Sequence, residues 1–181
     1  IHRLIKKTTG FFKLTDVYLV MEYLDGPSME KVRPKSFDEA ITIFQQTAAG
    51  LRHMHERGYV HADMKPNNIV VIPGPLCKVI DLGQSCKIGT VKPRIQGTPD
   101  YIAPEQVHRR AITPQTDIYN LGATMYWTLT NKTVPTALAK ADALVSRIDD
   151  DLIQRPKPAI EWNPRIPPKL NELVMHCVEI N

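Results

Sequence analysis

The pattern of apolar and polar residues changes along the chain from an extended to a helical period. Residues Val17 to Tyr23 are apolar and rich in β-forming side chains, which predicts a buried strand. The dipeptide Gly26-Pro27 predicts a turn soon after it. Two short strands are predicted further on, at residues 69–72 and 78–80, joined by a turn rich in proline. Most of the remaining apolar residues recur at helical spacing.

The first predicted helix begins at Ser36 and ends before Gly58. Ser36 with Glu39 three residues later forms a capping box, and Gly58 supplies the C-terminal stop. The residues that recur at helical spacing between these signals are Ala40, Ile43, Phe44, Thr47, Leu51 and Met54. We therefore expect a helix of about six turns.

A second helix is predicted to start at Thr113 and Pro114, and its strongly apolar sequence places it in the core. The residues expected to line its buried face are Ile118, Leu121, Gly122, Met125 and Leu129. An amphipathic segment follows from Ala137 to Ile148. The apolar positions of a last one are Leu170, Leu173, Val174, Cys177 and Val178. The predicted class is α+β and mainly helical.

Length and composition narrow the class of protein. The chain has 181 residues, 43% of them hydrophobic, which suits one globular core, and its prolines are spread over loops instead of forming a linker. Its three cysteines are odd in number and show no CxxC spacing, so neither a disulfide framework nor a zinc site is indicated. The net charge of +4 comes from scattered basic pairs, which favours a solvated surface and argues against nucleic-acid binding.

Two signals of membrane targeting are missing from the sequence. No stretch approaches the roughly 20 apolar residues of a membrane span, and the opening residues IHRLIKKTTG lack the apolar core of a signal peptide. We therefore expect a soluble, cytoplasmic segment without membrane contact of its own. An anchor elsewhere in a longer protein is compatible with this expectation.

The side chains best suited to catalysis lie close together in two short stretches, residues 61–68 and the turn at Asp81. HADMKPNN, at residues 61–68, sets a carboxylate at Asp63, an ammonium at Lys65 and an amide at Asn68, and a second carboxylate, Asp81, follows an apolar strand. Asp63 can accept or orient the proton of an acceptor hydroxyl, and Lys65 can neutralise charge on a moving phosphoryl group. Asn68 and Asp81 offer the hard oxygen ligands that Mg²⁺ prefers. A turn-capping aspartate and an ordinary surface lysine are the competing interpretations.

Five motifs in this order make the chain resemble the eukaryotic-like (Hanks-type) serine/threonine protein kinases, most closely their bacterial members. They are VYLVMEYLDG, HADMKPNN, the triplet Asp81-Leu82-Gly83, the triplet Ala103-Pro104-Glu105 and DIYNLG from Asp117. The resemblance covers nearly the whole chain. It implies a protein kinase-like fold in which residues 1–23 end the small lobe and residues 24–181 form the hinge and the large, C-terminal lobe.

The resemblance also implies a role for each site residue. Asp63 would be the catalytic base and Lys65 the lysine that contacts the phosphate, while Asn68 and Asp81 would ligate Mg²⁺, with Mn²⁺ as an alternative. Asp117 would hold the catalytic-loop backbone as well as cap its own helix.

Further contacts of ATP and of the catalytic base follow from the same resemblance. Glu22 and Leu24 belong to the hinge that would bind the purine of ATP, and Val70 would form the floor beneath it. Thr98 would bridge the base and the lysine, although a simple turn hydroxyl is the alternative for it. His61 would hold the loop by hydrogen bonding and by stacking with Leu82.

Three departures from the family pattern qualify these expectations. Ala62 stands where many kinases carry an arginine that pairs with a phosphorylated activation loop. The glycine-rich loop, the strand lysine and the helix glutamate of the small lobe are absent, and no GxGxxG occurs in the 181 residues. Glu105 resembles a carboxylate that pairs with an arginine beyond the last helix, and no such arginine follows here.

The leading hypothesis is an ATP-dependent kinase that acts on serine and threonine hydroxyls of proteins, with the 181 residues alone inactive or very weak. A pseudokinase or docking module is the alternative from another class. A small-molecule kinase of the aminoglycoside phosphotransferase type is the nearest alternative enzyme, but it shares neither the APE triplet nor Lys65. The expected partners are ATP and a protein substrate, without nucleic acid.

Overall fold

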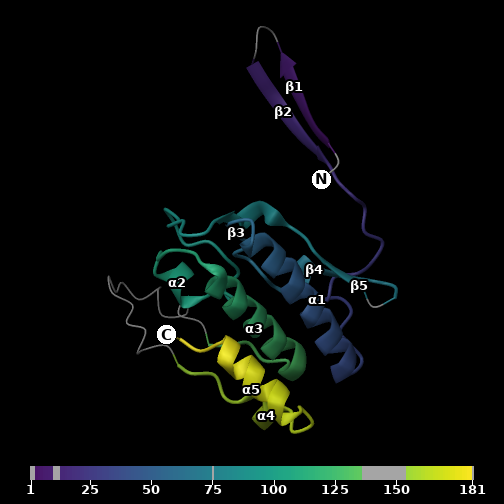
Figure 1. The fold of residues 1–181 in the computed structure, drawn as a ribbon, viewed down its shortest axis with the longest axis vertical. Coiled ribbons are helices and arrows are strands. Elements are labelled where there is room, and N and C mark those ends of the chain that lie inside the picture. Colours follow the sequence, from purple (N-terminus) through teal and green to yellow (C-terminus); the bar gives the residue numbers. More distant parts are fainter. Residues whose placement is uncertain (1–2, 10–12, 75, 136–153, 181) are drawn as a thin grey trace.

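The computed structural model describes residues 3–9, 13–74, 76–135 and 154–180. These residues form an N-terminal hairpin and a larger, mainly helical body, and the hairpin stands away from the helices (Figure 1). The amphipathic segment predicted from Ala137 to Ile148 lies outside the described residues. Among the described residues, no helix combines the length and apolar character needed to cross a membrane.

The hairpin consists of β1 (Arg3–Thr9) and β2 (Lys13–Val20), which pair antiparallel with Arg3 opposite Val20. The strand predicted in this region is therefore present, but its predicted burial is wrong. Val17, Tyr18 and Leu19 are 52%, 52% and 53% exposed. A two-stranded ribbon has two faces to cover, and in the described part of the chain its side chains face solvent on both of them.

Helix α1 (Phe37–His55) begins and ends close to the predicted residues. The Ser36 Oγ atom accepts the Glu39 N–H at 3.1 Å, while the Glu39 carboxylate accepts the Lys35 N–H at 2.7 Å, one residue before the cap. The capping box is thus shifted by one residue on its return side. Gly58 has a φ of 80° and donates its N–H to the His55 carbonyl at 2.9 Å, which ends the helix as predicted.

Two small antiparallel pairs enclose the loop that follows α1. Strand β3 (Tyr59–Val60) pairs with β6 (Cys86–Lys87), and β4 (Ile69–Ile72) pairs with β5 (Leu76–Val79). Between β3 and β4, residues Pro66–Asn68 form a single 3-10 turn. Pro66 suits this turn, because proline is favoured at the first position of a helical segment.

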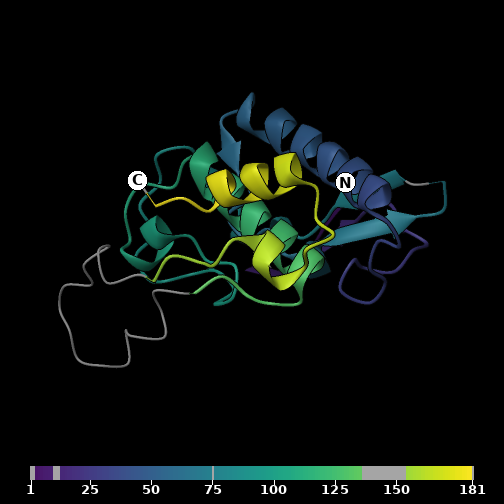
Figure 2. The ribbon, with the colours of Figure 1, turned by 90° about the horizontal axis from the view of Figure 1, so that it is seen from below.

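Helix α3 (Pro114–Thr130) lies at the centre of the helical body. The short α2 (Pro104–Val107) precedes it, and α4 (Ala159–Trp162) and α5 (Pro168–Cys177) pack against it (Figures 1 and 2). Its side chains are buried on most sides, as its apolar sequence predicts. The core is formed by this helix together with residues of α1, α4 and α5.

In the helices, two residues that were predicted to be buried, Ile118 and Leu173, are exposed. Ile118 is 46% exposed, although Gly122 one turn later meets Cys177 and Val178 at the end of α5. Because α5 ends there, the turn of α3 that holds Ile118 lies beyond its cover. Leu173 is 52% exposed, since the buried stripe of α5 is narrower than predicted and runs through Leu170, Val174 and Val178.

Candidate active site

One buried carboxylate of α3, that of Asp117, binds the backbone of the loop at residues 61–65. Asp117 is fully buried, and its Oδ2 and Oδ1 atoms accept the backbone N–H groups of His61 and Ala62 at 2.9 and 2.8 Å. His55 Nε2, from the end of α1, lies 2.8 Å from the same Oδ2. A buried carboxylate needs such partners, and in return it fixes the loop. The expected contact of Asp117 with the loop is confirmed.

The other expected task of Asp117, capping its own helix, falls to different residues. Thr116 accepts the Thr113 N–H at the start of α3 through its Oγ1 atom, at 3.2 Å. Both carboxylate oxygens of Asp117 are engaged by the loop and His55 instead. This buried group therefore acts on the loop and on the end of α1, and not on the start of its own helix.

His61 is a structural support of the loop. It is fully buried; its Nε2 atom lies 3.0 Å from the Ile80 carbonyl, and its Nδ1 atom accepts the Asp63 N–H at 3.3 Å. One ring nitrogen therefore donates and the other accepts, which is the pattern of a neutral imidazole. Leu82, which was expected to stack on His61, lies in a surface turn after Asp81 and is 54% exposed.

Asp63, Lys65 and Thr98 form a closed ring of hydrogen bonds. Lys65 Nζ donates to Asp63 Oδ2 and to Thr98 Oγ1, and Thr98 Oγ1 donates to Asp63 Oδ1, each at 2.9 Å. Asp63 itself is only 8% exposed. These bonds hold the Asp63 carboxylate beside the Lys65 ammonium group and the Thr98 hydroxyl. Such a pair can receive a proton and stabilise negative charge at one point.

Asn68 bonds to the backbone of Ile80, the residue before Asp81, and this brings Asn68 and Asp81 near each other. The side-chain Nδ2 of Asn68 donates to the Asp63 carbonyl at 2.8 Å, and its backbone carbonyl accepts the Ile80 N–H at 2.9 Å. Because Nδ2 is occupied, Oδ1 is the amide atom suited to a cation. Asp81 follows Ile80 with a φ of 65°, is exposed, and accepts the Gly83 N–H through Oδ1 at 3.1 Å.

These two residues fit a divalent metal that phosphates help to hold. Both offer hard oxygen donors, the type that Mg²⁺ and Mn²⁺ take. In the described ranges, no group of three or more His, Cys, Asp or Glu side chains could hold a metal ion alone. Mg²⁺ is commonly bound by one or two protein oxygens with phosphate and water completing its shell. A pair such as Asn68 and Asp81 is sufficient for that arrangement.

The expected purine site is built around β4. Val70 is 7% exposed and forms an isolated bridge with Ser28, and Val71 donates its N–H to the Pro27 carbonyl at 2.9 Å. The segment that follows the hinge is therefore paired with the strand that carries Val70.

Glu22 and Leu24, the residues expected to form the hinge, already have partners inside the chain. Lys78 Nζ lies 2.5 and 2.6 Å from the two carboxylate oxygens of Glu22, so a contact from Glu22 to a purine would come from its backbone. The carbonyl of Leu24 accepts the Gly26 N–H at 3.1 Å.

Three buried contacts near the site were missed by sequence reasoning. Gln106 is 3% exposed and bonds to both the loop and the segment before Thr98. Lys92 is 8% exposed and donates to the Gln84 carbonyl at 2.6 Å. Glu105, for which no arginine partner was expected in this chain, accepts from Thr116 Oγ1 at 2.6 Å. The one available signal was the position of Gln106 directly after the APE triplet.

Two tyrosines near the site resist ionisation. Burial, with smaller contributions from Asp100 and Glu30, raises the pKa of Tyr101 to about 12. Burial and the nearby Glu105 raise the pKa of Tyr119, on α3, to about 12 as well. Both phenols therefore stay neutral at the pH values at which proteins normally work.

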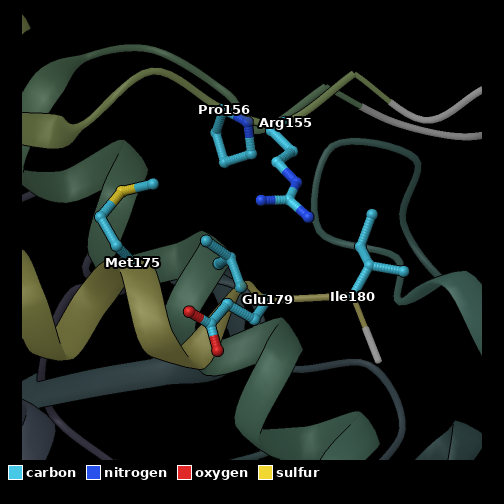
Figure 3. A pocket seen from close by; sticks show the side chains of 6 residues that line it. Arg155, Pro156, Met175, Glu179 and Ile180 are labelled. Carbon is cyan, nitrogen blue, oxygen red and sulfur yellow. The ribbon is translucent and has the colours of Figure 1, made fainter. Parts of the chain in front are cut away.

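A separate hollow of about 350 Å³ lies at the end of α5 (Figure 3). Its walls are Arg155, Pro156, Met175, Val178, Glu179 and Ile180. None of these residues belongs to the loop or to the segments that surround Asp63. The hollow is therefore separate from the candidate active site.

The sequence profile of the protein kinase domain matches residues 2–181. The chain belongs to the protein kinase family. A probable serine/threonine-protein kinase of Clostridium acetobutylicum is 31% identical over 90% of this chain, which corresponds to 25% of that protein. Serine/threonine-protein kinase D of Synechocystis is 33% identical over 82% of this chain and 33% of its own length.

Serine/threonine-protein kinase PknA of Mycobacterium tuberculosis is 32% identical over 87% of this kinase chain and 37% of that protein. The chain thus spans about a quarter to a third of the length of these relatives. The family and the bacterial character of the similar proteins agree with the resemblance drawn from the motifs. As members of this family use ATP and a divalent cation, the ring at Asp63 and the pair at Asn68 and Asp81 acquire a specific interpretation.

Proposed function

We propose that the protein carrying this chain transfers the γ-phosphoryl group of ATP to serine and threonine hydroxyls of proteins. The observation that supports this most strongly is the ring of Asp63, Lys65 and Thr98, with three hydrogen bonds of 2.9 Å. In this proposal, residues 1–23 end the small lobe of a kinase domain and residues 24–181 supply its hinge and large lobe.

Asp63 is the group assigned to the acceptor. The acceptor oxygen forms a bond to the γ-phosphorus as the bond from that phosphorus to the β,γ-bridging oxygen breaks, and ADP leaves with the electron pair. Asp63 orients the hydroxyl and accepts its proton, while Lys65 neutralises negative charge on the moving phosphoryl group. Thr98 holds both side chains, which reduces the freedom that the reaction would otherwise have to remove.

Asn68 and Asp81 are assigned to the nucleotide side. A bound Mg²⁺, or Mn²⁺ in its place, would neutralise phosphate charge there, and Asn68 Oδ1 with the Asp81 carboxylate would hold it. The hinge backbone from Glu22 to Leu24 binds the purine edge, and Val70 supplies an apolar floor. Asn68 also bonds to the Asp63 carbonyl, which links the position of the metal ligand to that of the base.

A phosphoryl-transfer assay tests this proposal on the full-length protein. With radiolabelled ATP, Mg²⁺ and a generic protein acceptor, we expect label on serine and threonine, and Asp63→Asn should lower kcat by about 10² or more. Nucleotide affinity should barely change in that variant. Asp38→Asn is the matched control, because Asp38 is exposed on the first turn of α1.

The outcomes separate the candidate functions. Near wild-type transfer by Asp63→Asn would remove Asp63 from the mechanism. Nucleotide binding without any transfer by the wild-type protein would instead favour a pseudokinase or docking module. Label found on a small molecule and never on protein would point to the aminoglycoside type of phosphotransferase.

A further inference from the structure

The side-chain amide of Gln106 is buried, and it makes two donor and two acceptor hydrogen bonds. Its Nε2 atom donates to the carbonyls of Ala62 and Gln96 at 2.9 and 3.1 Å. Its Oε1 atom accepts the backbone N–H of Ala103 and the Nδ2 of Asn120, both at 3.0 Å. One neutral side chain on α2 therefore joins the catalytic loop, the segment before Thr98, the start of α2 and helix α3.

The chemistry of these partners fixes the orientation of the amide. The two carbonyl oxygens can only accept and the Ala103 N–H can only donate, so exchanging the ends of Gln106 would oppose like groups in three places. Asn120 Nδ2 also donates to the Tyr101 carbonyl at 2.7 Å, which fixes the end of Asn120 that faces Gln106. A carboxylate or an apolar group of similar size would leave at least two of these buried partners unsatisfied.

The backbone on both sides of Gln106 is shaped to reach it. Ala62 adopts a φ of 61°, which is uncommon for a residue other than glycine, and its N–H and carbonyl meet Asp117 and Gln106. Gly97 has a φ of 140°, and a Cβ atom there would lie 3.2 Å from Gln106 Nε2 and 3.0 Å from Ile102 Cγ1. Glycine at this position lets the segment approach the amide closely.

The two carbonyls that Gln106 binds adjoin the proposed chemistry. Ala62 immediately precedes Asp63, and Gln96 lies two residues before Thr98. We propose that Gln106 is a positioning residue that sets the distance between the base and the segment of Thr98. This inference rests on the proposed kinase function. The Gln106 amide connects the loop to the segment before Thr98 without using a charge. Ala62 itself offers no cation that could bind a phosphate.

Two substitutions in the full-length protein test this role. Gln106→Glu keeps the shape but loses both donors, and Gln106→Met keeps the length without polar atoms. For either variant we expect kcat to fall about 10- to 100-fold, the size of effect that a misplaced catalytic group produces. The KM for ATP should stay within about twofold, because the partners of Gln106 lie on the acceptor side of the site. Gln45→Glu, an exposed position on α1, is the matched control.

A second readout does not need catalysis. Amide hydrogen exchange at residues 96–98 should become faster in the Gln106 variants and stay unchanged in Gln45→Glu, because the Gln96 carbonyl loses its anchor. If the wild-type protein transfers no phosphate while this exchange pattern holds, the proposed function has failed and the connection through Gln106 has not.

Four results would contradict the assignment. The first is a kcat within about threefold of wild type for both folded variants. The second is unchanged exchange at residues 96–98. The third is loss of folding in both Gln106→Glu and Gln106→Met, which would make the residue purely structural. A rise in the KM for ATP with unchanged kcat would also contradict a position on the acceptor side.

Discussion

The two carboxylates of the site are held in very different ways. Asp63 is 8% exposed and receives a hydrogen bond on each oxygen, from Lys65 and from Thr98. Asp81 is exposed, and its Oδ1 atom accepts the N–H of Gly83, two residues along the chain. The acceptor side is thus organised by contacts between distant segments, and the metal side by a local turn.

In the proposed reaction, this difference indicates which half of the chemistry the described residues can organise by themselves. Helix α3 fixes the loop through Asp117, and Gln106 ties the same loop to the segment of Thr98. On the proposed nucleotide side, the hairpin of β1 and β2 stands apart from the helices (Figure 1). Its described side chains are exposed. We infer that the acceptor side is ordered before ATP arrives, and that the nucleotide side depends on further groups.

The largest expected effect comes from testing the 181 residues without any further chain. Incubated with ATP, Mg²⁺ and a protein acceptor, they should transfer phosphate about 10⁴ to 10⁶ times more slowly than the full-length protein. No GxGxxG loop occurs in the sequence, so the triphosphate would be held from one side only. Two lost electrostatic contributions of roughly 3 to 4 kcal/mol each give this range.

A radiolabel assay with full-length protein as the positive control measures it. Turnover near ~1 per second, the low end for intact kinases, would mean that the nucleotide side is as complete as the acceptor side. The exposed apolar side chains of the hairpin should also make the isolated chain prone to association, which light scattering would detect.

Asp81→Ala in the full-length protein sharpens the comparison between the two carboxylates. Removing a metal ligand should weaken the Mg²⁺-dependent part of nucleotide binding by at least about 10², a loss typical of disturbed metal sites. Asp63→Asn should leave this binding nearly unchanged. Titration of Mg²⁺ into both variants, with binding followed by a fluorescent nucleotide, separates the two roles. Equal losses in both would contradict the division of the site into two sides.

Much of the acceptor side was predictable because its motifs are short and continuous. The spacing of Asp63, Lys65 and Asn68 sets their relative positions within one loop, and the capping residues Ser36 and Thr113 mark where α1 and α3 begin. The contact of Thr98 with the base and the lysine was expected from the resemblance, and the hydrogen bonds are present. The catalytic roles themselves stay predictions.

Other features depend on tertiary contacts that no local pattern encodes. The apolar run from Val17 to Tyr23 predicts a strand that is present only as far as Val20. Burial of this strand requires a partner surface, and the described residues provide none. Leu82 lies in a short turn that has no buried residue, and it is 54% exposed. Gln106 carries no periodic signal, since its importance comes from four partners scattered over residues 62–120.

Tyr119 should make the stability of the helical body depend on pH in the alkaline range. Its pKa is about 12 in the folded chain and about 10 when unfolded, so below pH 10 both states hold the proton. Between about pH 10 and 12 only the unfolded chain releases it, and the free energy of unfolding falls by roughly 2 kcal/mol as pH rises.

Urea unfolding followed by tryptophan fluorescence measures this contribution as the difference between wild type and Tyr119→Phe. The difference should shrink or reverse from pH 10 to pH 12, because phenylalanine has no proton to lose. Tyr18→Phe, on the exposed hairpin, is the control and should follow the wild type. A Tyr119→Phe curve parallel to that of the wild type would show that the phenol on α3 is less buried than its contacts indicate.

The smallest expected effect concerns phosphorylation of the activation segment, the residues between Asp81 and Glu105. The Ser85 N–H donates to the Leu82 carbonyl at 3.0 Å, and the Thr90 backbone bonds to Lys87 and Ile112 at 3.1 and 2.9 Å, so backbone contacts hold the segment without a phosphate. The Ser85 Oγ atom is buried and has no hydrogen-bond partner of its own. Replacing Ser85 and Thr90 together by alanine in the full-length protein should leave kcat within about threefold of the wild type. The measurement is a steady-state rate with protein that mass spectrometry shows to be unphosphorylated at both positions.

A fall of about 10³ or more, the size of a lost electrostatic contact at an active site, would mean that a cation other than the missing arginine binds a phosphate there. In that case the acceptor side would be completed by modification and would no longer differ from the nucleotide side in being ordered by its own contacts.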